Sequence, residues 1–525
     1  MPPIIIIPVA GVAVAYLFLR FLAYITYDPR QPPPVNGVVP FISPLIGMIT
    51  ENGGFYLRMW NEHKLPIYTL RVPGPPIYVV NSLAVCQRIN RHIMTVAFSP
   101  VQIRACEKAI GVGEKGMEIL SDDRHLEKDG YLRGFPSSST PATAPGPGLD
   151  ALSSAAVATF ATSTDQLSST GRSTVDLYQW ICHQILAATT EATYGPHNPF
   201  RDAKIAQAWF DFEPTIMTLI IDVLPKVFLW RGLHARSSMV DALNDYLEKD
   251  QHQEGSLFVQ LRRQRNIEFG LSVRDSAHTE LGQIAAGMLN TAPTTFWLIW
   301  TVLSDPIILR DCREEAEALV KVEDGTYTID LAQVRTACPI MLSTWQETLR
   351  FHGISPSPRL IKEDTMVDNF LLKKGATLLM PSGTVHTDKT IWGPDANMFD
   401  HKRFLKSESR TGQPATSAFR GFGSGHVICP GRHFATTEAL ALLTLMLVRF
   451  DVLPAGGKWI TPKKHMSIDR ASPLPIGDTK VEVIPRNRHK WRVLFSRNNS
   501  GLDIAGTDGN DGSEGALNHK MPDRA

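Results

Sequence analysis

The stretch Phe422-Gly-Ser-Gly-His-Val-Ile-Cys-Pro-Gly-Arg432 runs directly into a series of apolar residues at helical spacing. Cys429 is therefore expected just before a helix, with Pro430 at the first helical position, where a missing N–H is tolerated. The positive dipole end and unpaired N–H groups of a helix start favour a thiolate over a thiol. Gly425 and Gly431 let the backbone approach the sulfur and a flat group lying against it. Such a thiolate is suited to be the axial ligand of a haem iron.

The spacing Phe422-x-x-Gly425-x-x-x-Cys429-x-Gly431 resembles the haem-binding loop of the cytochrome P-450 superfamily. This resemblance implies haem b as cofactor, Cys429 as the thiolate ligand of its iron, and Phe422, Gly425 and Gly431 as cofactor-binding residues. The alternative for a cysteine in isolation is a buried structural residue beside a glycine-rich turn. The family usually has a basic residue two positions before the cysteine, which pairs with a haem propionate, but this chain has Val427. The propionates must therefore be paired elsewhere.

The composition is that of a large globular protein. The 525 residues are 43% hydrophobic and 20% charged, and the net charge is +1. A nearly neutral chain without a basic run argues against nucleic-acid binding. The six cysteines are scattered and form no CxxC pair. This pattern favours reduced thiols in the cytosol over a disulfide framework or a zinc site.

The N-terminus is an apolar block of nearly the ~20 residues that cross a bilayer. Arg20 is its only charged residue, and no small-residue cleavage site follows. We therefore expect a single-pass anchor over residues 1–27, in preference to a signal peptide or a buried core helix. Arg30 on its C-terminal flank places the bulk of the chain in the cytosol. The proline-rich residues 28–40 predict a stiff hinge, which resembles that of microsomal members of the family and implies the endoplasmic reticulum membrane.

The remaining residues predict one catalytic domain, 41–496, followed by a disordered tail, 497–525, rich in Gly, Asn, Asp and Ser. From about residue 149 to residue 350 the pattern is mostly helical. Alternating runs that predict strands occur at 67–80, 377–380, 480–484 and 491–495. The expected fold class is mainly α with a small β region, preceded by one transmembrane helix. By resemblance this is the cytochrome P-450 fold.

Two glycine-containing segments are expected to be loops. The first, Gly111-Val-Gly-Glu-Lys-Gly116, matches a dinucleotide fingerprint but follows no buried strand, so we expect a flexible loop. The second is the low-complexity segment 137–148. The family's early helix normally carries a tryptophan and an arginine that bind a haem propionate. This chain has no tryptophan between Trp60 and Trp180, so that arrangement is missing.

The segment from Leu281 to Val302 is apolar almost throughout and predicts one long buried helix. Pro293 lacks the N–H that would bond to the Leu289 carbonyl, so we expect a kink and a free carbonyl at that point. In the P-450 family this helix crosses the haem, and the kink is where oxygen binds. The resemblance therefore places residues around the kink in the catalytic site.

The family pattern in this helix, Ala/Gly-Gly-x-acid-Thr, is only partly present. The Ala-Gly pair matches at residues 286–287, but Leu289 replaces the acid and Asn290 replaces the threonine. Leu289 cannot relay a proton, and Asn290 forms hydrogen bonds without titrating. Asn290 and Thr291, with ordered water, are therefore the candidate catalytic residues. The alternative for Asn290 is a satisfied polar group in a helix interface. This version of the motif resembles the branch containing sterol 7α-hydroxylases and prostacyclin synthase.

Three further residues resemble the structural ion-pair network of the family. Glu347 and Arg350 are three apart and share a helix face, and Arg403 resembles the third member. An isolated Glu-x-x-Arg pattern is common on surfaces, where such pairs contribute little. In this order before Cys429 the three residues are expected to support the haem-binding side. Arg359 is expected to reach a haem propionate; the alternative is a solvated strand arginine.

Together these resemblances imply a membrane-bound haem-dependent monooxygenase. It would take electrons from NADPH through a separate cytochrome reductase and insert one oxygen atom from O2 into a bulky apolar substrate. A steroid, triterpene or other terpenoid of a biosynthetic pathway is expected. One alternative is a haem-thiolate isomerase or dehydratase that acts on a pre-oxidised substrate without a reductase, which the loss of the acid–alcohol pair would allow. The other is a non-catalytic haem-binding protein.

Overall fold

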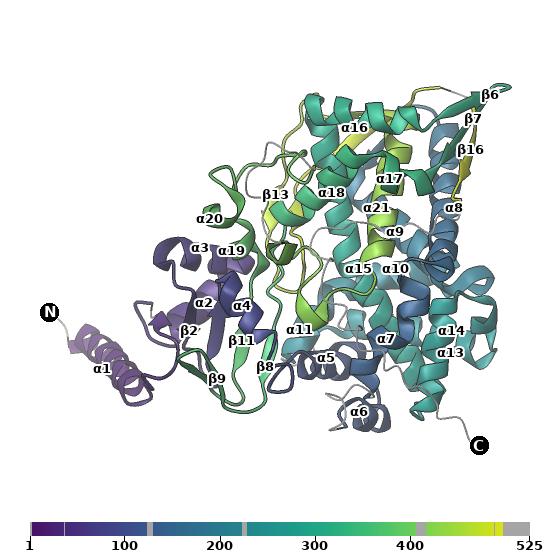
Figure 1. Ribbon diagram of the computed structural model, residues 1–525. Helices are drawn as coiled ribbons and strands as arrows, with labels where there is room; N and C mark the ends of the chain where they lie inside the picture. Colours follow the sequence, from purple (N-terminus) through teal and green to yellow (C-terminus); the bar gives the residue numbers. More distant parts are fainter. Residues whose placement is uncertain are drawn as a thin grey trace, which may run out of the picture.

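The computed structural model describes residues 3–35, 37–122, 130–222, 228–405, 416–487 and 489–496. It contains a large helical body and, beside it, a smaller region of strands and short helices (Figure 1). Helix α1 extends from this smaller region, at the left of the view. The predicted disordered tail, residues 497–525, lies outside the described residues.

Most of the described chain is helical, as predicted. The helices of its first half are α1 Pro3–Ile25, α2 Ile42–Glu51, α3 Gly53–His63, α4 Leu83–Ile89, α5 Ser99–Ala105, α6 Glu114–Leu120, α7 Tyr131–Thr143, α8 Pro147–Ser169, α9 Leu177–Tyr194, α10 Ala203–Phe212, α11 Ile216–Ile221 and α13 Trp230–Glu248. The later helices are α14 Leu257–Glu268, α15 Val273–Ser304, α16 Pro306–Ala318, α17 Val334–Ala337, α18 Pro339–Phe351, α19 Ser382–His386, α20 Lys389–Trp392 and α21 Arg432–Arg449.

Helices α15 and α21 form the centre of the helical body, where they contact each other (Figure 1). Every residue of α21 from Thr436 to Arg449 is buried. A helix that is buried on all sides lies inside a core rather than on its surface. The body of α21 is therefore in the middle of the protein, whereas Arg432, Phe434 and Ala435, at the end nearest Cys429, are only partly buried.

The strands form small sheets, again as predicted. One sheet has the order β1-β2-β3-β11-β8-β4, with β1 Pro34–Val35, β2 Ile67–Leu70, β3 Ile77–Val80, β4 Val96–Ala97, β8 Arg359–Ile361 and β11 Thr377–Leu379. The other strands are β5 Ser173–Asp176, β6 Lys321–Glu323, β7 Thr326–Asp330, β9 Thr365–Val367, β10 Phe370–Leu372, β12 Phe450–Pro454, β13 Lys463–His465, β14 Leu474–Ile476, β15 Lys480–Pro485 and β16 Lys490–Leu494. The six-stranded sheet positions Arg359, the first residue of β8.

The prediction of a loop at residues 137–148 was wrong. Helix α7 continues to Thr143, and α8 begins at Pro147. The hydroxyls of Ser139 and Thr143 donate to carbonyls of the preceding turn, at 3.1 and 3.0 Å, which gives these side chains partners within the helix. Ala142 of the same helix is fully buried. Tertiary packing thus overrides the weak helix propensity of this segment.

The prediction of a flexible loop at Gly111–Gly116 was also wrong in its second half. Helix α6 begins at Glu114, and the Gly113 N–H donates to the Asp275 carboxylate at 2.8 Å. A Cβ at Gly116 would lie only 2.7 Å from Val112 and 2.8 Å from Asp275. These glycines therefore allow a close approach to α15, and the Gly113 N–H is occupied by Asp275.

The predicted hinge is attached to the sheet. Within residues 28–40, Pro34 and Val35 form strand β1, which pairs in parallel with β2. The Thr69 hydroxyl donates to the Pro32 carbonyl at 2.7 Å, and the Tyr78 hydroxyl donates to Gln31 at 2.8 Å. Long-range hydrogen bonds thus hold this segment, so it is not a free spacer.

Within the described part of the chain, no single helix combines the length and the hydropathy of a membrane span, whereas the bent pair α15 and α16 meets both criteria together, at 105° to each other. The apolar stretch described in α1, Gly11–Ile25, is shorter. The membrane anchor over residues 1–27 therefore stays a prediction.

Candidate active site

Cys429 lies in a tight loop just before α21. Its N–H donates to the Phe422 carbonyl at 2.9 Å, which closes the loop between the two residues. The helix begins at Arg432, with Gly431 immediately before it. The prediction that Pro430 is the first helical residue was therefore wrong. Pro430 lies in the turn between the cysteine and the helix. That turn is held by a bond of 3.4 Å from the Arg432 N–H to the Cys429 carbonyl.

The charge state of Cys429 depends on opposing influences. Burial raises the pKa of its thiol, while the Gly431 N–H and the positive charge of Arg432 act in the opposite direction. Cys429 is only partly exposed to solvent. The surrounding protein therefore removes much, but not all, of the water around its thiol. Burial is the largest of these influences, and without a bound group the pKa of the thiol is raised. The thiolate of the haem-bound site stays a prediction. A bound metal ion is the usual means of deprotonating such a thiol.

The loop contains two glycines, Gly425 and Gly431, that lie near Cys429 in the sequence. A Cβ at Gly431 would point at Cys429 and lie 3.9 Å from its Sγ. Gly425 has a left-handed φ of +62°, and a Cβ there would come within 2.9 Å of Asn90. Only glycine adopts this conformation readily. The loop geometry therefore depends on Gly425, whereas a Cβ at Gly431 would lie in ordinary van der Waals contact with the sulfur.

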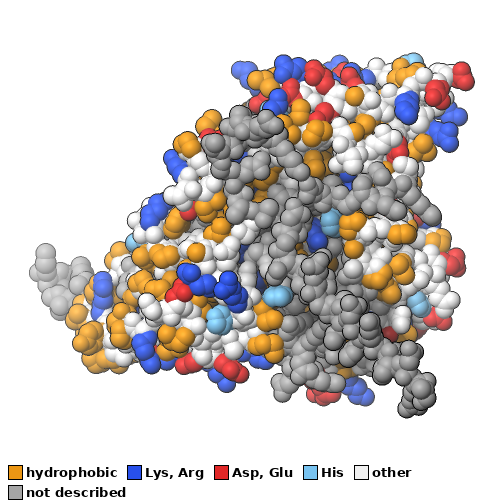
Figure 2. Space-filling model, viewed as in Figure 1, with side chains coloured by type: hydrophobic (Ala, Val, Ile, Leu, Met, Phe, Trp, Pro, Cys, Tyr) orange, Lys and Arg blue, Asp and Glu red, His pale blue; other side chains and the backbone are white. Residues whose placement is uncertain are grey.

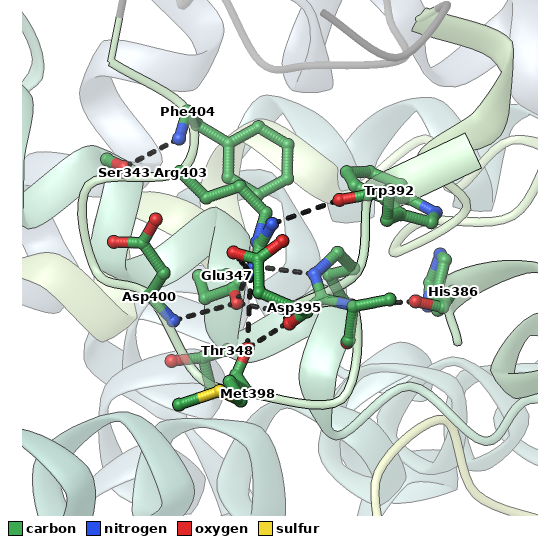
Figure 3. Close-up of polar contacts among 12 residues, drawn as sticks. Ser343, Glu347, Thr348, His386, Trp392, Asp395, Met398, Asp400, Arg403 and Phe404 are labelled. Carbon is green, nitrogen blue, oxygen red and sulfur yellow. Dashed lines mark hydrogen bonds and ion pairs between the residues drawn. The ribbon is translucent and has the colours of Figure 1, made fainter. Parts of the chain in front are cut away.

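Glu347, Arg350 and Arg403 are brought together in the interior. Figure 3 shows Glu347 and Arg403 of this group, with Asp395 and Asp400 beside them. Arg350 donates two hydrogen bonds of 2.7 Å to the Glu347 carboxylate, and both side chains are fully buried. Arg403 reaches the same carboxylate at 3.1 Å and also pairs with Asp395 at 3.0 Å. The backbone N–H of Asp400 donates to Glu347 as well, at 3.0 Å. One buried carboxylate thus joins α18 to the segment between residues 392 and 404.

The candidate catalytic residues Asn290 and Thr291 lie on α15. This helix runs from Val273 to Ser304 and continues past Pro293. Asn290 accepts a 2.7 Å hydrogen bond at Oδ1 from the Ala471 N–H. The Thr291 hydroxyl donates within the helix, to the Gly287 carbonyl at 2.8 Å. The Asn290 carboxamide oxygen therefore anchors a neighbouring segment, and the Thr291 proton is already used in a local hydrogen bond.

The carbonyl that Pro293 releases has found a partner. Arg470 donates from Nη1 to the Leu289 carbonyl at 3.0 Å and to the Glu213 carboxylate at 2.6 Å. The Arg470 side chain is 4% exposed, and that of Glu213 is 21% exposed. An ion pair thus lies against the part of α15 where the P-450 pattern would have an acid and an alcohol. Local sequence patterns gave no sign of either partner.

Two buried arginines approach the same region from different elements. Arg359 starts β8 and donates to the Pro358 carbonyl at 2.7 Å. Burial, together with the smaller effect of the nearby charge of Arg420, lowers the pKa of Arg359 to about 10. Arg420 begins the cysteine loop and is 2% exposed. Sequence analysis missed Arg420, although its position just before Phe422 in a loop that lacks the usual base was an available signal.

These features fit a haem with a thiolate ligand. The chain provides a cysteine before a buried helix, a glycine next to its sulfur, and buried cationic side chains suited to carboxylates. Cys429 would ligate the iron, and Arg359 would bind a propionate. When bound, the haem supplies the chemistry of oxygen activation.

Comparisons with known proteins identify the family of the chain. Residues 230–476 match the family model Cytochrome P450. A cytochrome P450 monooxygenase, nodJ, from Hypoxylon pulicicidum is 32% identical over 88% of this chain and 91% of that protein. A cytochrome P450 monooxygenase from Gibberella zeae is 26% identical over 85% of this chain and 86% of that protein. The human 7-alpha-hydroxycholest-4-en-3-one 12-alpha-hydroxylase is 32% identical over 31% of this chain and 36% of that protein.

The chain belongs to the cytochrome P450 family and is a P450 monooxygenase. It has the mainly helical P450 fold with small sheets, and membership implies haem with thiolate ligation of its iron. The roles of the individual site residues, and the division into anchor, hinge and domain, stay predictions.

Proposed function

We propose that this monooxygenase inserts one atom of O2 into a bulky apolar substrate, a steroid, triterpene or other terpenoid, in a biosynthetic pathway. NADPH supplies the electrons through a separate flavoprotein reductase that docks on the cysteine side. The similarity to a sterol 12α-hydroxylase and to a hamster cholesterol 7-alpha-monooxygenase, 29% identical over 34% of this chain, supports this substrate class. Both similarities are confined to about a third of the chain, so the substrate is a proposal.

The observation that carries the proposal is that the chain combines a loop cysteine, Cys429, with a largely apolar core helix, α15. Ala286 is exposed on α15, between residues that are buried or partly buried. A small exposed side chain on an otherwise buried helix is a surface that a ligand can contact, and the neighbouring, partly buried Leu289 is apolar. Apolar cavities with few polar groups select hydrophobic ligands. The site thus favours a substrate without charge.

Asn290 and Arg470 have a positioning role in this proposal. Both attach the segment around residue 471 to α15, through the Asn290–Ala471 bond and the Arg470–Leu289 bond. Ordered water beside them delivers protons in place of the missing acid–alcohol pair. The Glu213 carboxylate, which is partly exposed, connects this region with solvent.

The first test replaces Cys429 by alanine. Without the sulfur we expect the reduced, carbon monoxide-bound protein to lose the absorption band of a thiolate-ligated haem, and NADPH-dependent product formation to stop. Cys182→Ala, which removes a partly buried cysteine from α9, is the matched control and should keep both. Wild-type protein should oxidise members of a terpenoid panel when reductase and NADPH are added. An unchanged spectrum in the Cys429→Ala variant would contradict the proposal.

The isomerase alternative has a distinct signature. Conversion of a peroxide substrate without NADPH, together with no consumption of NADPH when reductase is present, would replace the monooxygenase proposal. The proteins matched over most of the chain are monooxygenases, which favours the oxidative reaction.

Replacing Asn290 by alanine is expected to uncouple the reaction. The Ala471 N–H loses its acceptor, at a cost of about 1–3 kcal/mol if that group stays buried, and the segment around residue 471 moves relative to α15. We expect a lower ratio of product to NADPH consumed and more hydrogen peroxide. Asn290→Asp keeps an acceptor and should retain most of the coupling. If Asn290→Ala forms as much product per NADPH as wild type does, Asn290 has no role in the reaction.

We further propose attachment to the endoplasmic reticulum membrane by residues 1–27, with the catalytic domain in the cytosol. Exposed apolar side chains on two helices support this: Phe18, Phe21 and Tyr24 on α1, and Ile46 and Ile49 on α2. Hydrophobic side chains also gather at the lower left of the molecule (Figure 2). Exposed apolar side chains of this kind suit a lipid contact. Recovery of the full-length protein in the soluble fraction of cells would contradict this localisation.

A further inference from the structure

Arg420 is a buried cation with no matching anion among the residues that the structure describes. Its side chain is 2% exposed, and within the same residues its Nε and Nη2 atoms have no hydrogen-bond partner. Its Nη1 atom donates only to Cys86 Sγ, at 3.3 Å. Burial raises the pKa of the Cys86 thiol, so this sulfur stays neutral and does not balance the charge.

The surroundings of Arg420 add positive charge. Arg359 is close enough for its pKa to be lowered by Arg420, and it is itself only 5% exposed. His386 accepts from the Arg420 N–H at 3.0 Å, and burial lowers the pKa of this histidine to about 3, so it is neutral. In the part of the chain that the structure describes, no carboxylate pairs with either guanidinium. Two buried like charges are costly unless a ligand supplies the opposite charge.

The position of Arg420 in the chain relates it to the cysteine loop. Its carbonyl accepts from the Gly423 N–H at 3.1 Å, so the turn that begins at Arg420 leads directly into the loop that Cys429 closes. Val427, where the family usually has its base, is in the same loop. Arg420 thus offers a guanidinium from the opposite end of the loop, whereas Val427 offers none.

We propose that Arg420, together with Arg359, binds the propionate carboxylates of the haem and takes over the role of the basic residue that is missing at Val427. The inference rests on the proposed haem site and adds a residue to it. The unpaired Nε and Nη2 atoms are adjacent donors on one guanidinium, which is the geometry that a carboxylate accepts in a bidentate pair. The haem carries two such carboxylates, and this region offers two buried guanidinium groups.

The experiment measures how fast the holoenzyme loses haem to an excess of apomyoglobin. Arg420→Met should increase the rate roughly 10- to 100-fold, because charge-assisted hydrogen bonds to the propionate are lost. Arg420→Lys keeps the positive charge but not the two adjacent N–H donors. Its rate of haem loss should therefore lie between those of wild type and Arg420→Met. The control Arg449→Met removes another buried arginine, at the far end of α21, and should leave haem loss within about twofold of wild type, since ~25 Å of helix separates it from the cysteine.

A second arm separates propionate binding from a purely structural role. When the haem is exchanged for its dimethyl ester, which lacks the propionate charges, wild type and Arg420→Met should lose it at equal rates. If the variant still loses the ester faster, or if it retains ordinary haem as long as wild type does, the inference is wrong. A wild-type protein that binds no haem would overturn the proposed function instead. If Arg420→Met cannot be isolated with haem, the same comparison between wild type and Arg420→Lys decides the question.

Discussion

Replacing Glu347 by alanine is expected to lower the free energy of unfolding by about 3–5 kcal/mol. Arg350 and Arg403 both depend on this carboxylate, and their side chains are 0% and 6% exposed. Without it, two buried guanidinium groups face each other with no opposite charge between them. The Asp400 N–H also loses its acceptor. We expect little or no stable haem incorporation, measured as the haem content of purified protein alongside a denaturant titration.

Two further variants make this result specific. Glu347→Gln keeps the shape of the side chain but not its charge, so it should be nearly as destabilised as Glu347→Ala. Asp395→Asn removes the outer carboxylate, which is 46% exposed and pairs only with Arg403. Solvent screens that pair, so its loss should cost less than about 1 kcal/mol and leave the haem content unchanged. Equal effects at Glu347 and Asp395 would show that the inner carboxylate has no special role.

The second large effect is a dependence of stability on pH that originates at Glu438. This residue on α21 is 2% exposed and has one hydrogen bond, from the Thr189 hydroxyl at 2.7 Å. Burial raises the pKa of Glu438 to about 8, from an ordinary value of 4.5. Unfolding between these pH values releases a proton, so the contribution to stability is fully present below about pH 4.5 and is lost as the pH rises toward 8.

The variant Glu438→Gln should remove this dependence, because glutamine keeps the acceptor for Thr189 and cannot ionise. Relative to wild type, its free energy of unfolding should rise with pH, by an amount on the order of 3–5 kcal/mol from pH 5 to pH 8.5. Denaturant midpoints across this range provide the measurement. Glu248→Gln, at an exposed position on α13, should show the same slope as wild type. A constant difference between Glu438→Gln and wild type would mean that Glu438 is ionised in the folded protein.

Local patterns were sufficient to predict the elements that carry the site. The helical spacing after Arg432 and the apolar run from Leu281 to Val302 predicted α21 and α15, because a buried face repeats every few residues along one segment. The same reasoning failed at residues 137–148. There the helix is stabilised by contacts with other elements, and composition does not reveal such contacts.

The sequence by itself determined the class of fold, the cysteine loop and the order of Glu347, Arg350 and Arg403. Each of these follows from residue types and their spacing along the chain. Only the tertiary structure decided the partners of the polar groups. Arg470 and Ala471 each reach α15 across 181 residues of chain. Arg420 lies beside Arg359, and no acid pairs with either of them within the residues that the structure describes. Hydrogen bonds and charges act over a few ångströms in space. Which residues come that close therefore depends on how the helices and sheets pack, and no local pattern records it.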